Sequence, residues 1–500
     1  MEALEVEISI AEGEQALQAL ITCVRERAGQ LEAHEAEKGI CKRLLPMGWA
    51  AMKRDFAQRG TGEGGPAITR ADGGILPREP KRRRRDYVSL FGTFAVARTC
   101  DRTPGEPGIV PLDAQVNRPE RCDSSFLQEW MTLFAVEHPF KERADFLAPL
   151  FDLEVAESVL RAVAKEAPED DEGFDAQRPM PQEDPEGELL GVSFDGKGVP
   201  MIKTEAVKLK AKLGTGEKRQ RKQEALVGVS STVDAKPRAP EALAELLVDP
   251  EAARARRQRE GTSDEAPRAQ QVRRVASLVR TKQAVMERIK ADAERRDPQP
   301  RQPVVIRLDG ARCVWSLAPK LCKPWKHVTC VLDMMPVVSD LWTAATALFQ
   351  EGSQDGTRGV RAKLTEMLRG RVGDVIGGLR QLLTKRQLRK SVRQTLAQVI
   401  TCLHNHRRWM PYDAYLAAGL PVGTGVGESA GGAVVKHRLE GDGKRWSLAG
   451  AEAILAWRSL KKSHDHDLRD YWQFRARQVR LRLDGRHPKY RPTEPLRRVA

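Results

Sequence analysis

The chain has 500 residues and carries 84 lysines and arginines against 69 aspartates and glutamates, which gives a net charge of +15. Hydrophobic residues make up 40% of the sequence, and no uncharged apolar run approaches the roughly 18 residues that a bilayer span requires. This composition excludes a membrane-embedded protein, a collagen and a wholly disordered chain. The positive charge favours a polyanionic partner, most often nucleic acid, although a basic enzyme without such a partner has the same balance.

The length predicts about three domains, and the cysteines and first residues indicate the compartment. The chain opens on the acidic stretch MEALEVEISIAEGEQ rather than on the basic and then apolar segment of a secretory signal. The eight cysteines include no CxxC pair, so we expect reduced thiols. These features predict a cytoplasmic protein that does not associate with a membrane.

Residues 1–86 predict a helical segment that ends in a basic linker. Apolar residues recur at helical spacing within residues 14–58, and a glycine-rich stretch follows at 60–74. The run KRRRR then stands at residues 81–85. Such a run fits either a solvated tail or an arm that contacts phosphates.

Residues 87–170 predict a strand pair followed by three helices. YVSLFGTFAVAR alternates as two strands would, and the first of three helical patterns has Ser124 or Ser125 as its N-cap. Three short helices with tight links fit a helix-turn-helix DNA-binding domain, and they fit an ordinary helical subdomain equally well. The acidic, proline-rich residues 171–188 predict a linker after this domain.

The following part of the chain, residues 189–445, predicts an α/β catalytic domain. Residues 187–202 indicate two strands around a turn at 196–198, and later apolar runs indicate further strands. The remaining expected segments are helical insertions at about 236–300 and 337–418, and a basic helical C-terminal tail at 446–500.

Three acidic residues stand where an α/β sheet builds its site. Asp195 and Asp309 each end an apolar strand pattern, and Glu428 opens the helix after the glycine-rich turn GTGVG. Three converging carboxylates would make an oxygen site suited to Mg²⁺, and two such ions can drive phosphodiester chemistry. Each motif also has a structural explanation, because Asp-Gly is a common turn and an acid at a helix N-terminus stabilises the dipole.

The sequence resembles the DDE transposases of the ISKra group of bacterial insertion sequences. The resemblance runs from about residue 87 to 475 and rests on the order of its motifs, which include YVSLFGTFAVAR, SFDGKGVPM, RLDGARCVW, VLDMMPVVSDLWTAA, MPYDAYLAAGLPVGTGVGES and KRWSLAGAEAILAWRSL. It implies a ribonuclease H-like catalytic core, with helical insertions, that follows a mostly helical DNA-binding region.

This resemblance also implies roles for individual residues. Asp195 would be the first catalytic acid, Asp309 or its rival Asp333 the second, and Glu428 the third, together holding two Mg²⁺ or Mn²⁺ ions. The expected activity is strand cleavage and strand transfer of DNA, by a nucleoid-associated homodimer or larger assembly on DNA. The expected DNA contacts are Lys208, Lys210, Lys212, Lys436, Arg438, Lys444, Arg445 and Trp446.

Departures from the family pattern keep two other functions open. Pro336 stands where relatives usually have a histidine, GESAGG replaces a Cys-containing basic stretch, and only Cys100 and Cys122 remain of the N-terminal cysteine pairs. These differences would fit a catalytically inactive DNA-binding relic. The GESAG motif also fits the nucleophile elbow of a serine hydrolase, with Ser429 as nucleophile and a histidine such as His437, His464 or His466 as its partner.

Overall fold

The chain divides into two compact units in a computed structural model, residues 1–176 with 468–500 and residues 177–467. The structure describes residues 2–27, 32–69, 74–106, 108–140, 148, 151–178, 187–206, 221–260, 269–309, 312–323, 325–385, 387–423, 430–441, 443–463, 467–486 and 491–492. None of the helices in these ranges combines the length and the apolar character needed to cross a membrane. The division at residue 176 falls within the segment that the sequence predicts as an acidic linker.

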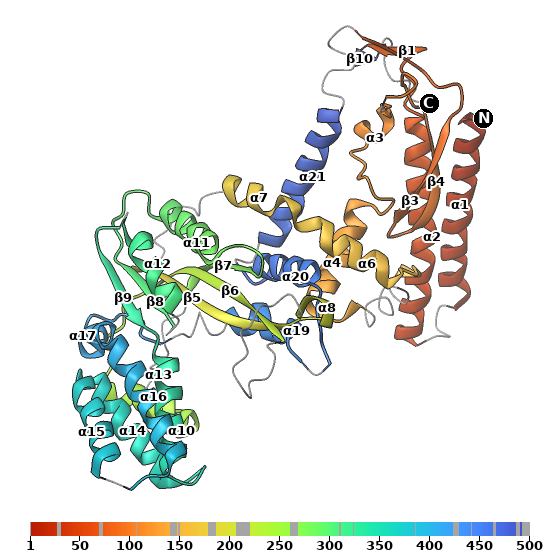
Figure 1. The fold of residues 1–500 in the computed structure, drawn as a ribbon. Helices are drawn as coiled ribbons and strands as arrows, with labels where there is room; N and C mark the ends of the chain where they lie inside the picture. Colours follow the sequence, from red (N-terminus) through yellow and green to blue (C-terminus); the bar gives the residue numbers. More distant parts are fainter. Residues whose placement is uncertain are drawn as a thin grey trace. The chain divides into compact units, whose positions relative to one another are not determined.

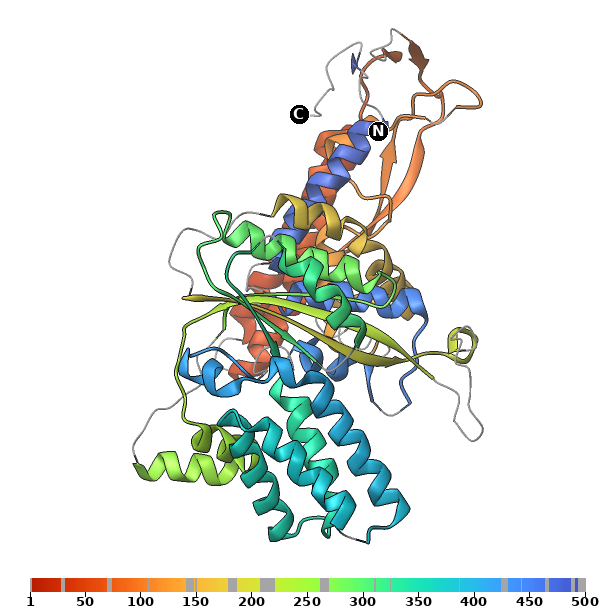
Figure 2. The ribbon, with the colours of Figure 1, turned by 60° about the vertical axis from the view of Figure 1, so that its left-hand side comes forward.

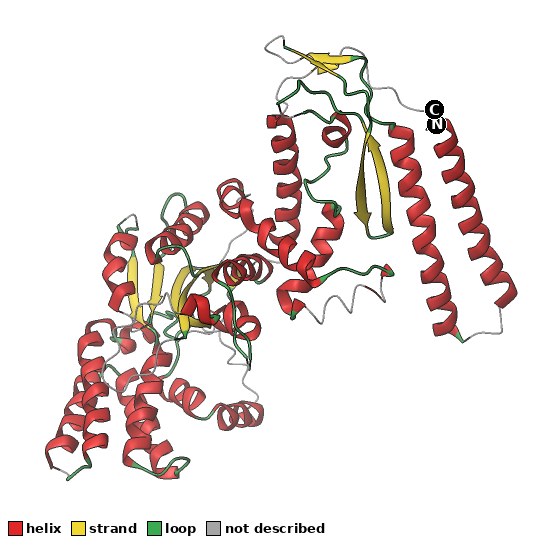
Figure 3. Cartoon of the chain, turned by 45° about the vertical axis from the view of Figure 1, so that its right-hand side comes forward, coloured by secondary structure: helices red, strands yellow, loops and turns green. Residues whose placement is uncertain are grey.

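The first unit begins with two long helices, α1 (Glu2–Arg27) and α2 (Ala33–Arg59), where the sequence predicts one amphipathic segment. They pack against each other, and Lys53 of α2 forms an ion pair with Glu12 of α1 at 2.9 Å. Figure 3 shows this helical pair and the two-stranded ribbon of the same unit. A small sheet follows, made of β1 (Ala67–Thr69), β2 (Ile75–Pro77) and β10 (Arg491–Pro492).

The predicted strand pair is confirmed as an antiparallel ribbon of β3 (Arg83–Ser89) and β4 (Gly92–Arg98). Tyr87 and Phe94 lie opposite each other in the register, and both rings contact Phe56 of α2, with centroids 5.0 and 5.3 Å from it. One face of the ribbon is therefore buried on α2. The cationic run of residues 81–85 enters β3, where its first four side chains are exposed.

Two of the three helices predicted after the ribbon are present. Ser124 caps α4 (Ser125–Glu137), its hydroxyl accepting a hydrogen bond from the Leu127 amide at 3.0 Å, and α6 (Glu157–Glu166) follows. The middle helix, predicted at residues 138–151, lies mostly outside the described residues. The other helices among the described residues of this unit are α3 (Pro111–Gln115), α7 (Asp171–Gln177) and α21 (Asp467–Arg486), and η1 (Ala167–Asp170) is a 3₁₀ turn.

The expected linker at 171–188 is therefore helical in its first part. Phe174 of α7 is 3% exposed, and its ring packs edge-on against Tyr471 of α21 with centroids 5.4 Å apart. The segment was predicted as a linker because of its acidic composition, but the buried ring of Phe174 packs this helix against the first unit. The remaining residues of the predicted linker, 179–186, lie outside the described part.

The second unit contains a five-stranded mixed sheet in the order β7-β6-β5-β8-β9. The strands β5, β8 and β9 run parallel, and β6 runs antiparallel to both of its neighbours. Figures 1 and 2 show helices on both faces of this sheet. Its strands are β5 (Leu189–Pro200), β6 (Lys222–Val233), β7 (Gln270–Ser277), β8 (Val304–Leu308) and β9 (Val328–Leu332).

The region predicted as two strands around a turn is the single long strand β5, so that prediction is wrong. Gly196 and Gly198 lie within its ladder, opposite Leu226 and Glu224. A Cβ atom at Gly196 would lie 2.4 Å from Glu224 Oε1, so this glycine admits a neighbouring side chain and makes no turn. Asp195 consequently lies inside a strand, where alternation assigns it to one face of the sheet.

The helical insertion predicted at 236–300 contains a strand. It folds as α9 (Pro240–Val248), α10 (Pro250–Glu260), the edge strand β7 and α11 (Lys282–Arg296). The segment was predicted as helical because it is rich in Arg, Ala and Glu, but Arg273 of β7 is only 3% exposed. Its guanidinium donates to the Ser463 hydroxyl at 3.3 Å, which offsets part of the cost of burying it.

The second insertion, predicted at 337–418, is confirmed as helical. It contains α13 (Met334–Leu348), α14 (Gln354–Leu368), α15 (Val372–Lys385), α16 (Lys390–His406), the 3₁₀ turn η2 (Arg407–Trp409) and α17 (Tyr412–Ala417). Their apolar faces share one core with the sheet. Where this unit is described, it also contains α8 (Lys203–Ala206), α12 (Arg312–Cys322), the π-helical turn η3 (Gly431–Lys436), α19 (His437–Leu439) and α20 (Leu448–Lys461).

The start of the expected C-terminal tail is also part of this unit. α20 packs on β7, and its Trp457 is fully buried. The tail interpretation followed the basic residues and missed the apolar stripe around Trp457 that faces the sheet. Only the part of the segment from α21 onward belongs to the first unit.

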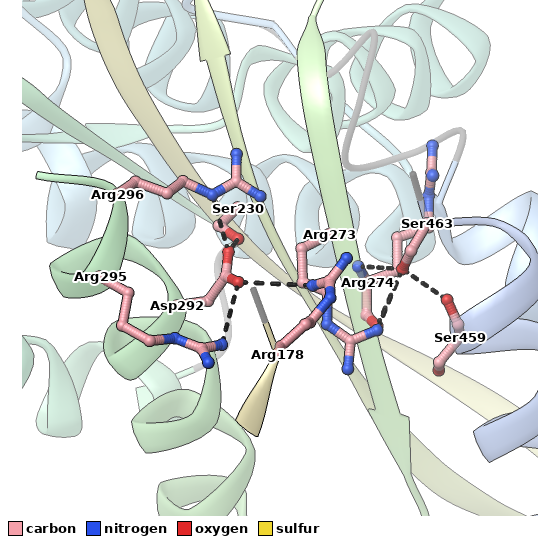
Figure 4. Close-up of polar contacts among 9 residues, drawn as sticks. All are labelled: Arg178, Ser230, Arg273, Arg274, Asp292, Arg295, Arg296, Ser459 and Ser463. Atoms are coloured by element: carbon pink, nitrogen blue, oxygen red, sulfur yellow. Dashed lines mark hydrogen bonds and ion pairs between the residues drawn. The ribbon is translucent and has the colours of Figure 1, made fainter. Parts of the chain in front are cut away.

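A buried network of charges joins α11 to β6 and β7 (Figure 4). The Asp292 carboxylate accepts hydrogen bonds from the Ser230 hydroxyl at 2.5 Å and from Arg296 Nε at 3.0 Å. Arg178 and Arg295 each approach its other oxygen at 3.6 Å. Burial raises the pKa of Asp292, but the arginines and the hydroxyl together hold this pKa below its ordinary value, so the carboxylate is charged.

Candidate functional site

Asp195 and Asp309 lie on neighbouring parallel strands and at the same level of the sheet. Phe194 of β5 pairs with Leu308 of β8, so the next residue of each chain is one of the two acids. Neighbouring strands in a sheet are about 4.8 Å apart. Asp333 follows β9 at the same level, because Leu308 pairs with Leu332. Three of the predicted acids are therefore at one level of the sheet, Asp195 inside β5 and Asp309 and Asp333 directly after β8 and β9.

Asp195 points away from the face that α11 covers. A Cβ at Gly228 would lie 2.7 Å from Ile289 of α11 and 2.9 Å from the Phe194 ring, so Phe194 faces α11. By alternation, Asp195 faces the other side, where η3 begins at Gly431. The segment just after the predicted third acid is therefore packed against the first.

The carboxylate of Asp195 is paired with a lysine on its own strand. Lys197 Nζ lies 2.9 Å from Asp195 Oδ2, and the two side chains are 20% and 21% exposed. Within the described part of the chain, Oδ2 accepts no hydrogen bond, so this ion pair is its polar contact. One oxygen of Asp195 thus already contacts a cation, as it would in binding a metal ion.

Gly431 makes this close approach possible. A Cβ atom there would lie 2.8 Å from Asp195 Oδ2 and 2.7 Å from Lys197 Cε, whereas a Cβ at Gly432 would meet only His437 Nε2 at 3.9 Å. We expect Gly431→Ala to lower the free energy of unfolding by about 1–3 kcal/mol, because the pair must shift. Gly432→Ala is the matched control, and we expect it to change stability by less than about 1 kcal/mol.

Urea unfolding of the two variants checks this expectation. Equal stability of both variants would mean that η3 moves aside freely and does not brace Asp195.

Asp309 is held by an aromatic stack that sequence reasoning did not find. The Trp315 indole N–H donates to the Asp309 carbonyl at 2.6 Å, and the Trp315 ring stacks on Trp409 with centroids 3.9 Å apart. Arg408 covers the other side of Trp409 at 3.7 Å. The only signal in the sequence was the tryptophan in RLDGARCVW, since its partner lies in a distant turn.

Asp333, the rival for the second acid, has a structural role. It is 5% exposed, and its carboxylate caps α13 by accepting from the Met335 amide at 2.9 Å. Burial lowers the pKa of the neighbouring Arg307, and the charge of Asp333 opposes that shift. The residue that departs from the family, Pro336, lies in the first turn of the same helix, where proline is tolerated.

Glu428 lies outside the described residues, so the three-acid arrangement is seen only in its first two members. In the ranges given above, no three carboxylate, histidine or cysteine side chains form a group that could hold a metal ion. The two placed acids nevertheless fit such an ion in kind, because they are oxygen ligands on adjacent strands and one already binds an ammonium group.

The predicted DNA contacts fall into three groups. Lys208, Lys210 and Lys212 lie outside the described residues, while Lys436 and Arg445 are exposed and Lys444 is half-buried. Arg438 is 2% exposed and Trp446 9% exposed, with the guanidinium 4.7 Å above the indole. Because this pair is packed inside the unit, we remove both residues from the set of DNA contacts.

The structure does not test the predicted serine-hydrolase site, because Ser429, His464 and His466 lie outside the described residues. Among its members only His437 is described, as an exposed residue of α19.

Compared with protein-family models and with curated proteins, the chain has no match.

Proposed function

We propose that the chain is a DDE-type DNA transposase that cleaves and transfers DNA strands with divalent metal ions. The observation that carries this proposal is the common level of Asp195 and Asp309 on adjacent parallel strands. Two acids brought together from distant parts of the chain, both in motifs of the ISKra resemblance, are what such an enzyme requires.

The sheet supports a ribonuclease H-like core for this domain. In the order β7-β6-β5-β8-β9, with β6 alone antiparallel, Asp195 lies on the central strand and Asp309 directly follows the neighbouring strand β8. Helices lie on both faces (Figure 2), and along the chain the α13–α17 lobe follows β9 and precedes the segment that contains Glu428. This lobe is the insertion that we expect in a transposase core.

The acids would have different roles, and their surroundings indicate which role each has. Asp195 and Asp309 would supply the metal ligands, Glu428 would complete the set from the segment before η3, and Asp333 would hold β9 and α13 in place. Bound there, two divalent ions would activate an attacking hydroxyl and stabilise the leaving oxygen of a phosphodiester. The protein's own task is to position the DNA against these carboxylates.

The first unit would contact DNA phosphates through its basic ribbon. A groove there is lined by Glu79, Pro80, Lys81, Arg82, Arg83, Arg84, Arg85 and Arg98. Glu79 is the single acid in it, and Arg83 binds that acid at 2.8 Å. Lys81, Arg82 and Arg84 are exposed, so the groove carries an excess of positive charge toward solvent.

We expect alanine at Lys81, Arg82 and Arg84 together to weaken DNA binding and flatten its salt dependence. Each lost phosphate contact lowers the slope of log K against log salt by about 0.9, so the slope should fall by up to about 3. The matched control replaces three exposed cations of the helical lobe, Arg358, Lys385 and Arg393. Fluorescence anisotropy at several salt concentrations measures both; an equal fall in the control would remove the groove from the proposal.

The function itself is tested by nicking of DNA. Purified protein is incubated with a supercoiled plasmid that carries its gene and flanking DNA, in Mg²⁺, in Mn²⁺ and in a chelator. Metal-dependent cuts at fixed positions on both sides of the gene support the proposal. Salt-sensitive binding without cleavage in any divalent ion would favour the inactive relic, and labelling of Ser429 by a fluorophosphonate would favour the hydrolase. Assembly as a homodimer or larger complex on DNA, and location at the nucleoid, belong to the same proposal.

A further inference from the structure

We infer that Lys197 is an internal competitor for the metal ion, because its ammonium occupies the Asp195 oxygen that a divalent cation would use. This inference rests on the proposed function, since it concerns how the same carboxylate is loaded. It assigns to Lys197 a positioning role that the acidic motifs do not provide.

The contact is built into the strand. Lys197 follows Asp195 by two residues on β5, so both side chains leave the same face of the sheet. Across the ladder Lys197 lies opposite Ala225, which has a small and fully buried side chain. The ammonium reaches Oδ2 at 2.9 Å without any change in the backbone.

Packing from the C-terminal side limits the alternatives of this pair. η3 begins at Gly431, where a Cβ atom would collide with both the lysine stem and the aspartate oxygen. Each side chain retains only about a fifth of its exposed surface. The pair is therefore more desolvated than an ordinary surface ion pair. While η3 stays in place, the lysine has little room to move away from Asp195.

Two cations compete for one oxygen. An ammonium group at hydrogen-bond distance and a metal ion at about 2.1 Å exclude each other on the same side of Oδ2, so metal entry displaces Lys197. The apparent association constant for metal is then the intrinsic constant multiplied by the fraction of molecules in which the lysine has released the oxygen. In the metal-free protein, the lysine holds the carboxylate in one orientation.

The test is the affinity for Mn²⁺ in the absence of DNA, measured by the electron paramagnetic resonance signal of the free ion during titration of the full-length protein. We expect Lys197→Met and Lys197→Gln to bind Mn²⁺ about fivefold more tightly than the wild type, which corresponds to about 1 kcal/mol. Lys197→Arg keeps a cation at this place and should stay within about twofold of the wild type.

Lys282→Met is the matched control for loss of one positive charge. Lys282 on α11 pairs with Glu224 at 2.5 Å and is 30% exposed, so it resembles Lys197 in its surroundings but contacts a different acid. We expect this variant to stay within about twofold of the wild type, because it does not touch Asp195.

Asp195→Asn separates failure of the inference from failure of the proposed function. If this variant loses Mn²⁺ binding while both neutral Lys197 variants bind no more tightly than the wild type, competition by Lys197 is wrong and the metal site stands. If Asp195→Asn binds Mn²⁺ as well as the wild type does, the proposed metal site itself is wrong. Tighter binding by Lys282→Met to the same extent would reduce the effect to general charge and would also overturn the inference.

Discussion

Asparagine at position 195 is expected to abolish metal-dependent cleavage of DNA, with a rate at least about a thousandfold below that of the wild type, or about 4 kcal/mol in the activation free energy. The carboxylate lies on the central strand, on the face opposite α11, and within the described residues its Oδ2 pairs with Lys197 and accepts no hydrogen bond. An asparagine amide has the same shape as the aspartate carboxylate but carries no charge. The fold should therefore persist while the chemistry is lost.

The same substitution at the neighbouring positions distinguishes the two possible second acids. Asp309→Asn should resemble Asp195→Asn, with cleavage lost and stability retained. Asp333→Asn should instead lower stability, because its carboxylate caps α13 and lies beside the buried Arg307. Asp355→Asn on the exposed surface of α14 is the control and should cleave like the wild type.

Nicking of the plasmid substrate, measured beside circular dichroism of each variant, gives both readouts. Full cleavage by a folded Asp195→Asn protein would contradict the catalytic assignment.

Loss of Asp292 is expected to cause the largest loss of stability. Asp292→Ala should lower the free energy of unfolding by about 3–5 kcal/mol, because it leaves a buried group of arginines without their counter-charge. Arg296 is 5% exposed and Arg178 12% exposed on their side chains, so neither reaches water easily (Figure 4). Removing a partner from a buried pair costs more than the pair itself contributes.

The pH dependence has a defined sign. The folded-state pKa of Asp292 is lowered, so its stabilising effect is present above the pKa of the unfolded chain, about 3.9, and is lost as pH falls through the folded value. Asp355→Ala removes an exposed carboxylate that pairs with Arg358 at 2.6 Å and should change stability by less than about 0.5 kcal/mol. Urea unfolding at pH 7 and below pH 4 measures both, and a loss under about 1 kcal/mol for Asp292→Ala would mean that the arginines relax into solvent.

The common position of Asp309 and Asp333 along the sheet could be predicted from the sequence, because parallel strands bring their carboxyl ends to one edge of a sheet. Apolar runs before Asp309 and Asp333 were sufficient for that step. The position of Asp195 was predicted less well, since two glycines in SFDGKG indicated a turn. In the structure these glycines admit side chains from β6, a cross-strand requirement that local sequence does not carry.

Burial of polar side chains explains most of the remaining differences. β7 was missed because Arg273 is buried through a contact with Ser463, which is distant in sequence. Arg438 and Trp446 were assigned to DNA because their chemistry suits it, yet they pack on each other inside the unit. The brace of Trp315 on Trp409 depends on tertiary packing in the same way.

Anomalous diffraction from crystals grown with Mn²⁺ will show whether Asp195, Asp309 and Glu428 share metal ions. We expect two manganese peaks about 3.5–4 Å apart, with oxygens of Asp195, Asp309 and Glu428 at about 2.1 Å from them and Lys197 moved away from Asp195. A well-ordered Glu428 far from the other two acids, with no manganese between Asp195 and Asp309, would contradict it.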